Sequence, residues 1–171
     1  MTPAIPFEYF ASPLATPVVT GFSPEAEKML GMLKDALDHL WQTSVREQRL
    51  EEAVAALNDV YQECCESNWD GYGAQAITEG AYQEAFKFLT LLPLNVPIPE
   101  VVPEPSGAIG LEWSRGRYFV FVASFSGENF ITYAGVFGVN KIHGIEYFAD
   151  SLPSIIVENI RRLYTHSIPV S

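Results

Sequence analysis

The sequence predicts an α+β fold, in which an N-terminal helical hairpin and a third helix pack on an antiparallel meander of three or four strands, closed by a C-terminal helix. Two observations carry this prediction. Apolar residues recur every three or four positions before residue 93, which is a helical period, and every two positions after residue 108, which is a strand period. Short turns separate the expected strands, and such turns join antiparallel neighbours. Helices on one side of such a sheet form an α+β domain.

A chain of 171 residues and 19.0 kDa suits a single domain with a sizeable core. We expect residues 1–22 to form a proline- and aromatic-rich arm that packs on its own domain, or on a neighbouring subunit (a homo-oligomer) or partner; the remaining alternative is disorder. Residues 23–171 are expected to form one α+β domain. Its parts are a helical region over 23–92, a sheet over 98–150 and a helix over 151–164.

The helical region begins with a clear start signal. Ser23 is a suitable N-cap and Pro24 suits the first helical position. An apolar stripe then runs to Trp41, where its phase slips, and residues 44–47 have the pattern of a capping box. A second stripe over residues 50–64 completes the expected hairpin.

A third helix is expected from about Thr78 to Leu92, followed by a proline-rich extended connector. Strands are then predicted over 109–114, 118–125 and 130–137, with a short further strand over 142–148. Ser151 is expected to cap the last helix, with Pro153 early in it.

The charge balance restricts the partners. The chain has 21 acidic and 10 basic residues, a net charge of -11, which repels phosphate backbones and anionic lipid. Direct nucleic-acid or membrane binding is therefore disfavoured, and a basic protein partner is favoured; the alternative is an acidic surface that only keeps the protein soluble. The acidity concentrates in the expected hairpin, and the candidate partner interface there consists of Asp35, Asp38, Glu47, Glu51, Glu52 and Asp59.

The two cysteines, Cys64 and Cys65, are adjacent and end a helix rather than begin one, which argues against a catalytic thiolate. The N-terminal residues lack the pattern of a secretory signal, and no apolar run approaches the roughly 20 residues that span a bilayer. These features predict a cytoplasmic, reduced protein.

The segment from Asn68 to Ala74 is the most distinctive stretch of the chain. Two glycines alternate with large aromatic residues there, a composition typical of a tight corner. Asp70 is expected to accept backbone N–H bonds within that corner, and alternatively to act as an acid, base or ligand beside Tyr72. Glu112 is expected to point outward from its strand, or to form part of a site if helices cover it. The candidate binding residues are Trp69, Asp70, Tyr72, Glu112, Trp113 and His143.

No established catalytic signature is present. The glycines do not form a dinucleotide- or phosphate-binding loop, and neither a zinc-protease motif nor a nucleophile elbow occurs. The three histidines, His39, His143 and His166, lie in separate regions. We therefore predict no catalytic residue, no metal site and no cofactor.

The corner Asn68-Trp-Asp-Gly-Tyr-Gly-Ala74, together with the strand Gly107-Ala-Ile-Gly-Leu-Glu-Trp113, resembles a group of small uncharacterised bacterial proteins. The resemblance covers roughly residues 68–163 and implies no reaction. It suggests a bacterial accessory protein, with an antitoxin, immunity or inhibitor role by association.

Three functions follow from these features. The first is a non-enzymatic interaction module that binds a basic protein through its acidic helical face. The second is an enzyme or sensor that binds a small molecule or metal at the Trp69–Tyr72 corner. The third is a subunit of a larger bacterial assembly.

Overall fold

The computed structural model describes residues 23–165, and the expected arm over residues 1–22 lies outside the described part. The chain divides into two compact units, residues 1–39 and residues 40–171, and the first helix contributes to both. The described elements are α1 (Pro24–Glu63), α2 (Glu79–Leu91), five strands and α3 (Ser154–Thr165). This is an α+β fold, and two details of the expected architecture are wrong.

The first correction concerns the helical hairpin. α1 is one helix of 40 residues, with no corner near Trp41. Its start is as expected, since the Ala26 amide donates to the Ser23 hydroxyl at 3.3 Å. No glycine or proline occurs between residues 32 and 63, so the residues of the supposed capping box continue the helix. The slip in phase separates exposed apolar residues before residue 42 from a stripe that enters the core through Ala53 and Leu57.

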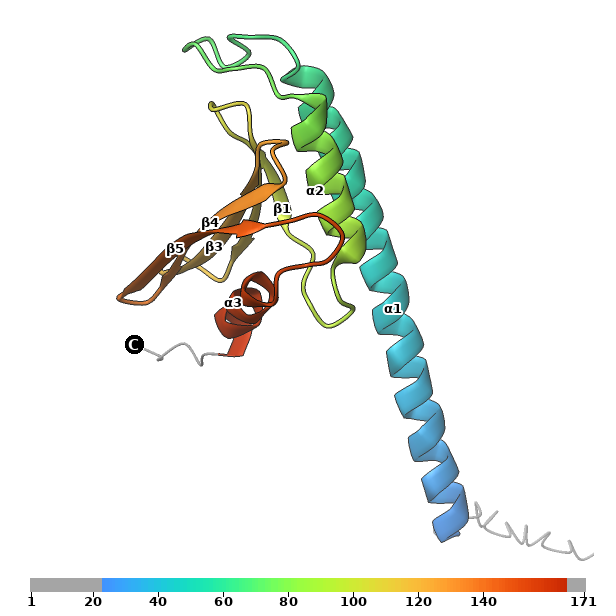
Figure 1. The fold of residues 1–171 in the computed structure, drawn as a ribbon. Helices are drawn as coiled ribbons and strands as arrows, with labels where there is room; N and C mark the ends of the chain where they lie inside the picture. Colours follow the sequence, from blue (N-terminus) through green and yellow to red (C-terminus); the bar gives the residue numbers. More distant parts are fainter. Residues whose placement is uncertain (1–22, 166–171) are drawn as a thin grey trace, which may run out of the picture. The chain divides into compact units, whose positions relative to one another are not determined.

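The second correction concerns the sheet, which has five strands rather than three or four. They follow one another in chain order as an antiparallel meander: β1 (Glu100–Pro103), β2 (Ile109–Ser114), β3 (Phe119–Phe125), β4 (Phe130–Phe137) and β5 (Asn140–Tyr147) (Figure 1). β1 lies in the proline-rich segment that was expected to form an extended connector, although the sheet region as a whole was expected to begin at residue 98. Because β1 is an edge strand that pairs with β2 alone, it tolerates a proline that a central strand would not.

The register divides the strand residues between two faces. Leu111 pairs with Ala123, and Trp113 pairs with Phe121, so these four side chains share the inner face. All four are buried. The residues between them in sequence, including Glu112, point to the opposite face, which we call the outer face.

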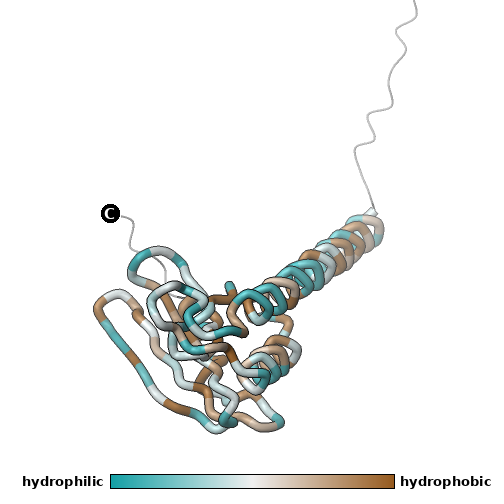
Figure 2. Tube along the Cα trace, turned by 90° about the horizontal axis from the view of Figure 1, so that it is seen from above, coloured by the Kyte–Doolittle hydropathy of each residue, from teal (hydrophilic) through white to brown (hydrophobic). Residues whose placement is uncertain are grey.

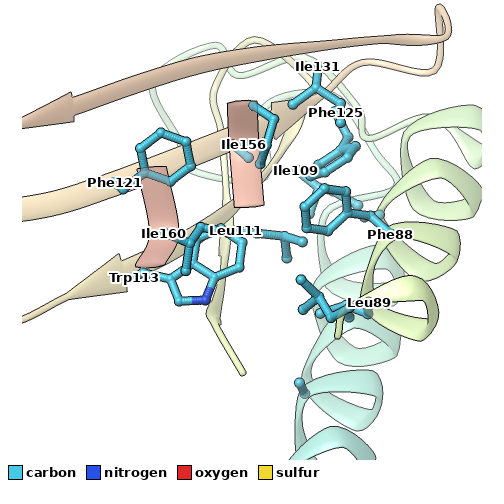
Figure 3. Close-up of a cluster of buried hydrophobic side chains, with 14 of the residues drawn as sticks. Phe88, Leu89, Ile109, Leu111, Trp113, Phe121, Phe125, Ile131, Ile156 and Ile160 are labelled. Carbon is cyan, nitrogen blue, oxygen red and sulfur yellow. The ribbon is translucent and has the colours of Figure 1, made fainter. Parts of the chain in front are cut away.

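α2 and α3 supply the other half of the core. Phe88 of α2 and Ile160 of α3 are fully buried against the inner face (Figure 3). The Phe88 ring centre lies 6.2 Å from that of Trp113, 5.0 Å from that of Phe125 and 5.8 Å from that of Phe148. Phe88 thus joins α2 to the sheet and to the segment that follows β5.

Two helix starts differ in how well the sequence predicted them. The start of α2 was expected at about Thr78, and Thr78 is its N-cap, with its hydroxyl accepting the Ala81 amide at 3.1 Å. α3 begins at Ser154, three residues later than the start expected at Ser151. Its first amides use the Pro153 carbonyl, which accepts from Ile156 at 3.1 Å, so Pro153 precedes the helix.

Candidate functional site

The Asn68–Ala74 corner is closed by its own polar groups. Asn68 has a positive φ of 67°, and its side-chain oxygen accepts the Gly73 amide at 2.8 Å. The Asn68 amide donates in turn to the Ala74 carbonyl at 2.7 Å. The Trp69 indole N–H donates to the Gln75 carbonyl at 3.0 Å, and its ring packs against the core. The corner is therefore a hydrogen-bonded turn anchored by one aromatic side chain.

The Asp70 carboxylate is part of this turn. Its Oδ1 atom accepts the Tyr72 amide at 2.8 Å and the Ala74 amide at 3.1 Å. These backbone donors hold the pKa of Asp70 below its ordinary value, while desolvation acts weakly in the opposite direction. The Tyr72 side chain is 95% exposed. No hydrogen bond or ion pair within residues 23–165 joins Asp70 or Tyr72 to Glu112. The expectation that Asp70 accepts backbone N–H bonds within the corner is confirmed.

The depressed pKa gives a testable pH dependence. A carboxyl whose folded-state pKa is lowered stabilises the fold above its unfolded-state pKa of about 4, and loses this effect as the pH falls through the folded-state value. Asp70→Asn is therefore expected to lower the thermal unfolding midpoint at neutral pH, with the difference from the wild type shrinking in acid. Thermal unfolding followed by circular dichroism from neutral pH to about pH 2 measures this difference. Glu128→Gln, at an exposed carboxylate in the β3–β4 turn, is the control. A difference that stays constant down to the lowest pH would contradict the prediction.

The other three candidate binding residues lie in the sheet. Trp113 is 1% exposed on the inner face, and its indole N–H donates to the Pro97 carbonyl at 2.7 Å, so it is a core residue. Glu112 and His143 lie on the outer face and belong to one cross-strand row, separated by Val122 and Ala134. Three strand spacings, about 14 Å, lie between their backbones. Glu112 and His143 therefore share the outer face of the sheet, and neither belongs to the Asn68–Ala74 corner.

The six acidic residues of the expected interface all lie on α1 and are exposed: Asp35, Asp38, Glu47, Glu51, Glu52 and Asp59. Glu52 accepts a hydrogen bond from Gln48 at 3.0 Å. α1 as a whole has nine acidic and four basic residues, a net charge of -5. This helix is therefore an acidic surface element.

Apolar residues of the stripe that was expected before Trp41 are also exposed on α1. Met29, Leu30, Leu33 and Leu37, which we call the leucine row, are 64%, 50%, 58% and 65% exposed. Their three- and four-residue spacing places them on one side of the helix. Figure 2 shows hydrophobic residues recurring along this part of α1. An apolar stripe on a helix is normally buried, so the exposure of four such side chains in one row is unusual.

A groove in the second unit was missed by the sequence analysis. It has a volume of about 430 Å³ and is lined mainly by apolar residues, with Arg46 and Arg49 at its side. Arg46 is held by the carbonyls of Leu92 at 2.8 Å and Pro93 at 3.0 Å, while its buried Nε atom has no hydrogen-bond partner among the described residues. The only sign of this groove in the sequence was the spacing of Trp41, Arg46 and Arg49 along one helix. The groove forms because the fold places the loop after α2 beside these residues.

The two cysteines are adjacent in the chain but differ in burial. Cys64 is buried, Cys65 is exposed, and both are free. Burial raises the pKa of the Cys64 thiol, and the charges of Glu63 and Cys65 raise it further. Because the thiolate is the nucleophile, these effects disfavour nucleophilic chemistry at Cys64.

Comparisons with protein-family models, with curated proteins and with solved structures found no match. Within residues 23–165, no three His, Cys, Asp or Glu side chains gather as metal ligands. In the same part of the chain, each helix is too short or too polar to cross a membrane.

Proposed function

We propose that the protein is a non-enzymatic interaction module that binds a basic, amphipathic helix of a partner protein through α1. The observation that carries the proposal is the leucine row, whose four apolar side chains are at least half exposed. Such a row suits the apolar face of a second helix, because helix-in-groove and helix-to-helix recognition both use anchors at three- and four-residue spacing.

The charge of α1 indicates the chemistry of the partner. Glu25, Glu27, Asp35 and Asp38 share this segment with Lys28 and Lys34, and the whole chain carries a net charge of -11. Basic side chains beside the apolar face of the partner would be attracted, and this attraction would accelerate association and fix orientation. An antitoxin, immunity or inhibitor protein that binds a basic enzyme would use such a surface.

The corner supports the small-molecule or metal function less well. The Oδ1 atom of the Asp70 carboxylate already accepts two backbone amides, and the Trp69 indole N–H already donates to a carbonyl. These groups hold the turn, which leaves fewer polar atoms at the corner for a ligand. The interaction function uses side chains that are already exposed.

Binding to two synthetic amphipathic helices tests the proposal. The peptides share one apolar face and carry either Lys or Glu beside it. We expect the Lys peptide to bind more tightly, and its association to slow as salt screens the attraction. The double variant Leu33→Asp, Leu37→Asp is expected to weaken binding by at least roughly thirtyfold, which corresponds to the loss of one strong anchor.

Leu94→Asp is the matched control, because Leu94 is a 70% exposed leucine outside α1. Its binding should equal that of the wild type. Circular dichroism would establish that α1 stays helical in each variant. Equal binding of both peptides, or unchanged binding by the double variant, would refute the proposal.

A further inference from the structure

The outer face of the sheet has an apolar centre between an acidic and a basic edge. The acidic edge is formed by Glu100 of β1 and Glu112 of β2, and the basic edge by Lys141 and His143 of β5. The centre is formed by alternate residues of β3 and β4, namely Val120, Val122, Ala134 and Val136. The acidic edge continues at Glu104, whose carboxylate accepts the hydroxyl of Ser124 on this face.

This face is accessible and slightly hollowed. A depression of about 330 Å³ lies over the central valines and extends to Lys141 and His143. Ile145 and Tyr147, which also point outward from β5, are 66% and 64% exposed. A contiguous apolar surface of this kind on a soluble domain usually marks an interaction site.

Each cross-strand row of side chains on the outer face can pair with the same row of a second copy that is read in the opposite direction, from β5 to β1. One row reads Glu100, Glu112, Val122, Ala134, His143 from β1 to β5. If a second copy lies face to face with its strand order reversed, Val122 meets Val122, and each Glu100 meets the His143 of the other copy.

The next cross-strand row can pair with its own reverse in the same way, and its end residues are apolar. It reads Val102, Gly110, Ser124, Thr132, Ile145, so reversal brings Val102 opposite Ile145 and Ser124 opposite Ser124. Lys141, one row in the other direction, lies near the acidic edge of the second copy. Like residues thus meet at the centre, and each acidic edge lies opposite the edge that carries Lys141 and His143.

We infer that the outer face binds a second copy of this chain, forming a two-fold dimer whose axis runs parallel to β3 between the two sheets. An interface of this kind uses the same patch on both copies, as the reversed rows require. Face-to-face packing of two antiparallel sheets with roughly aligned strands is a common arrangement. The inference rests on the sheet alone and is independent of the function proposed for α1.

The size of the face sets the expected strength. Five strands at about 4.8 Å spacing and about six residues long cover roughly 400 Å² per copy in projection. With protruding side chains, the area buried over both copies is about 1,000 Å², the lower end of specific interfaces. We therefore expect a reversible dimer whose population rises with protein concentration.

Sedimentation equilibrium of the full chain measures the dimer. The wild type is expected to approach twice the 19.0 kDa mass of one chain as concentration increases. Val122→Asp places two carboxylates at the centre of the interface and is expected to raise the dissociation constant by roughly a hundredfold. Val139→Asp, at a 97% exposed position in the β4–β5 turn, is the control and should dimerise normally.

A pair of charge-reversal variants tests the orientation. The first carries Glu100→Lys and Glu112→Lys, and the second carries Lys141→Glu and His143→Glu. Each variant alone should be monomeric, because like charges then face one another. An equimolar mixture should form a heterodimer, because the outer face of the first variant is basic at both edges and that of the second is acidic at both edges.

Three results would overturn the inference. A wild type that stays monomeric at the highest soluble concentration shows that the face does not bind a second copy. A dimer that survives Val122→Asp must form through another surface. Charge-reversal variants that each still dimerise alone would contradict the reversed orientation of the two sheets.

Discussion

Phe88→Ala is expected to lower the free energy of unfolding by about 3–5 kcal/mol, the range for truncating a buried aromatic ring. Phe88 is fully buried, and its ring contacts those of Trp113, Phe125 and Phe148. These neighbours belong to two strands and to the segment after β5, so they cannot all move into the space left by the ring. Domains are stable by about 5–15 kcal/mol in total, and this loss is a large part of that.

Urea denaturation measures the change, with the midpoint and slope compared between variant and wild type. Phe86→Ala is the matched control on the same helix, because Phe86 is 39% exposed and stacks mainly on Tyr82. Its expected cost is about 1 kcal/mol. Equal costs for the two substitutions would show that the aromatic cluster does not join α2 to the sheet.

Gly127→Ala is expected to destabilise the fold by about 2–4 kcal/mol, through backbone strain and a steric clash together. Gly127, in the β3–β4 turn, has a φ of +88°, and an added Cβ would lie 2.8 Å from the Ala81 amide nitrogen at the start of α2. The turn cannot simply move away, because the Gly127 and Asn129 amides both donate to the carboxylate of Glu84 on the same helix.

Gly116→Ala separates the two contributions to this cost. Gly116 has a similar φ of +93°, but an added Cβ there would meet nothing within 4 Å. Its expected cost is about 1 kcal/mol, from backbone conformation alone. Urea denaturation of both variants gives the difference, which is assigned to the contact between the β3–β4 turn and α2. A Gly127→Ala variant as stable as Gly116→Ala would contradict that contact.

Several features that depend on groups close in sequence were predicted correctly, whereas the Ser151 cap and the capping box over residues 44–47, which are also local patterns, were not. Ser23 caps α1 as predicted, because its hydroxyl and the amide that it accepts are only three residues apart. Thr78 caps α2 in the same way, at the position where that helix was expected to begin. Asp70 accepts amides two and four residues away, so the Asn68–Ala74 corner is a local structure. The strand register follows the period-two pattern from Ile109 to Phe125, with the larger apolar residues on the inner face.

Where an element depends on distant groups, the sequence was insufficient. β1 is a strand because β2 supplies its partners, and no local pattern in a proline-rich segment shows that. The apolar phase slip in α1 resembled a turn, but it separates an exposed row from a buried stripe within one helix. The Arg46 groove exists because the carbonyls of Leu92 and Pro93 reach a helix more than 40 residues earlier.

The two candidate surfaces, α1 and the outer face of the sheet, also combine features that the sequence determined with features that only the fold determined. The sequence by itself determined the acidity of α1, the spacing of its leucine row and the alternation of side chains along each strand, because charge and period are local properties. Only the tertiary structure decided that Trp113 is buried while Glu112 and His143 share one row of the outer face. That row depends on the register of four strands, and this register is set by hydrogen bonds between neighbouring strands, which the side-chain pattern of a single strand does not specify.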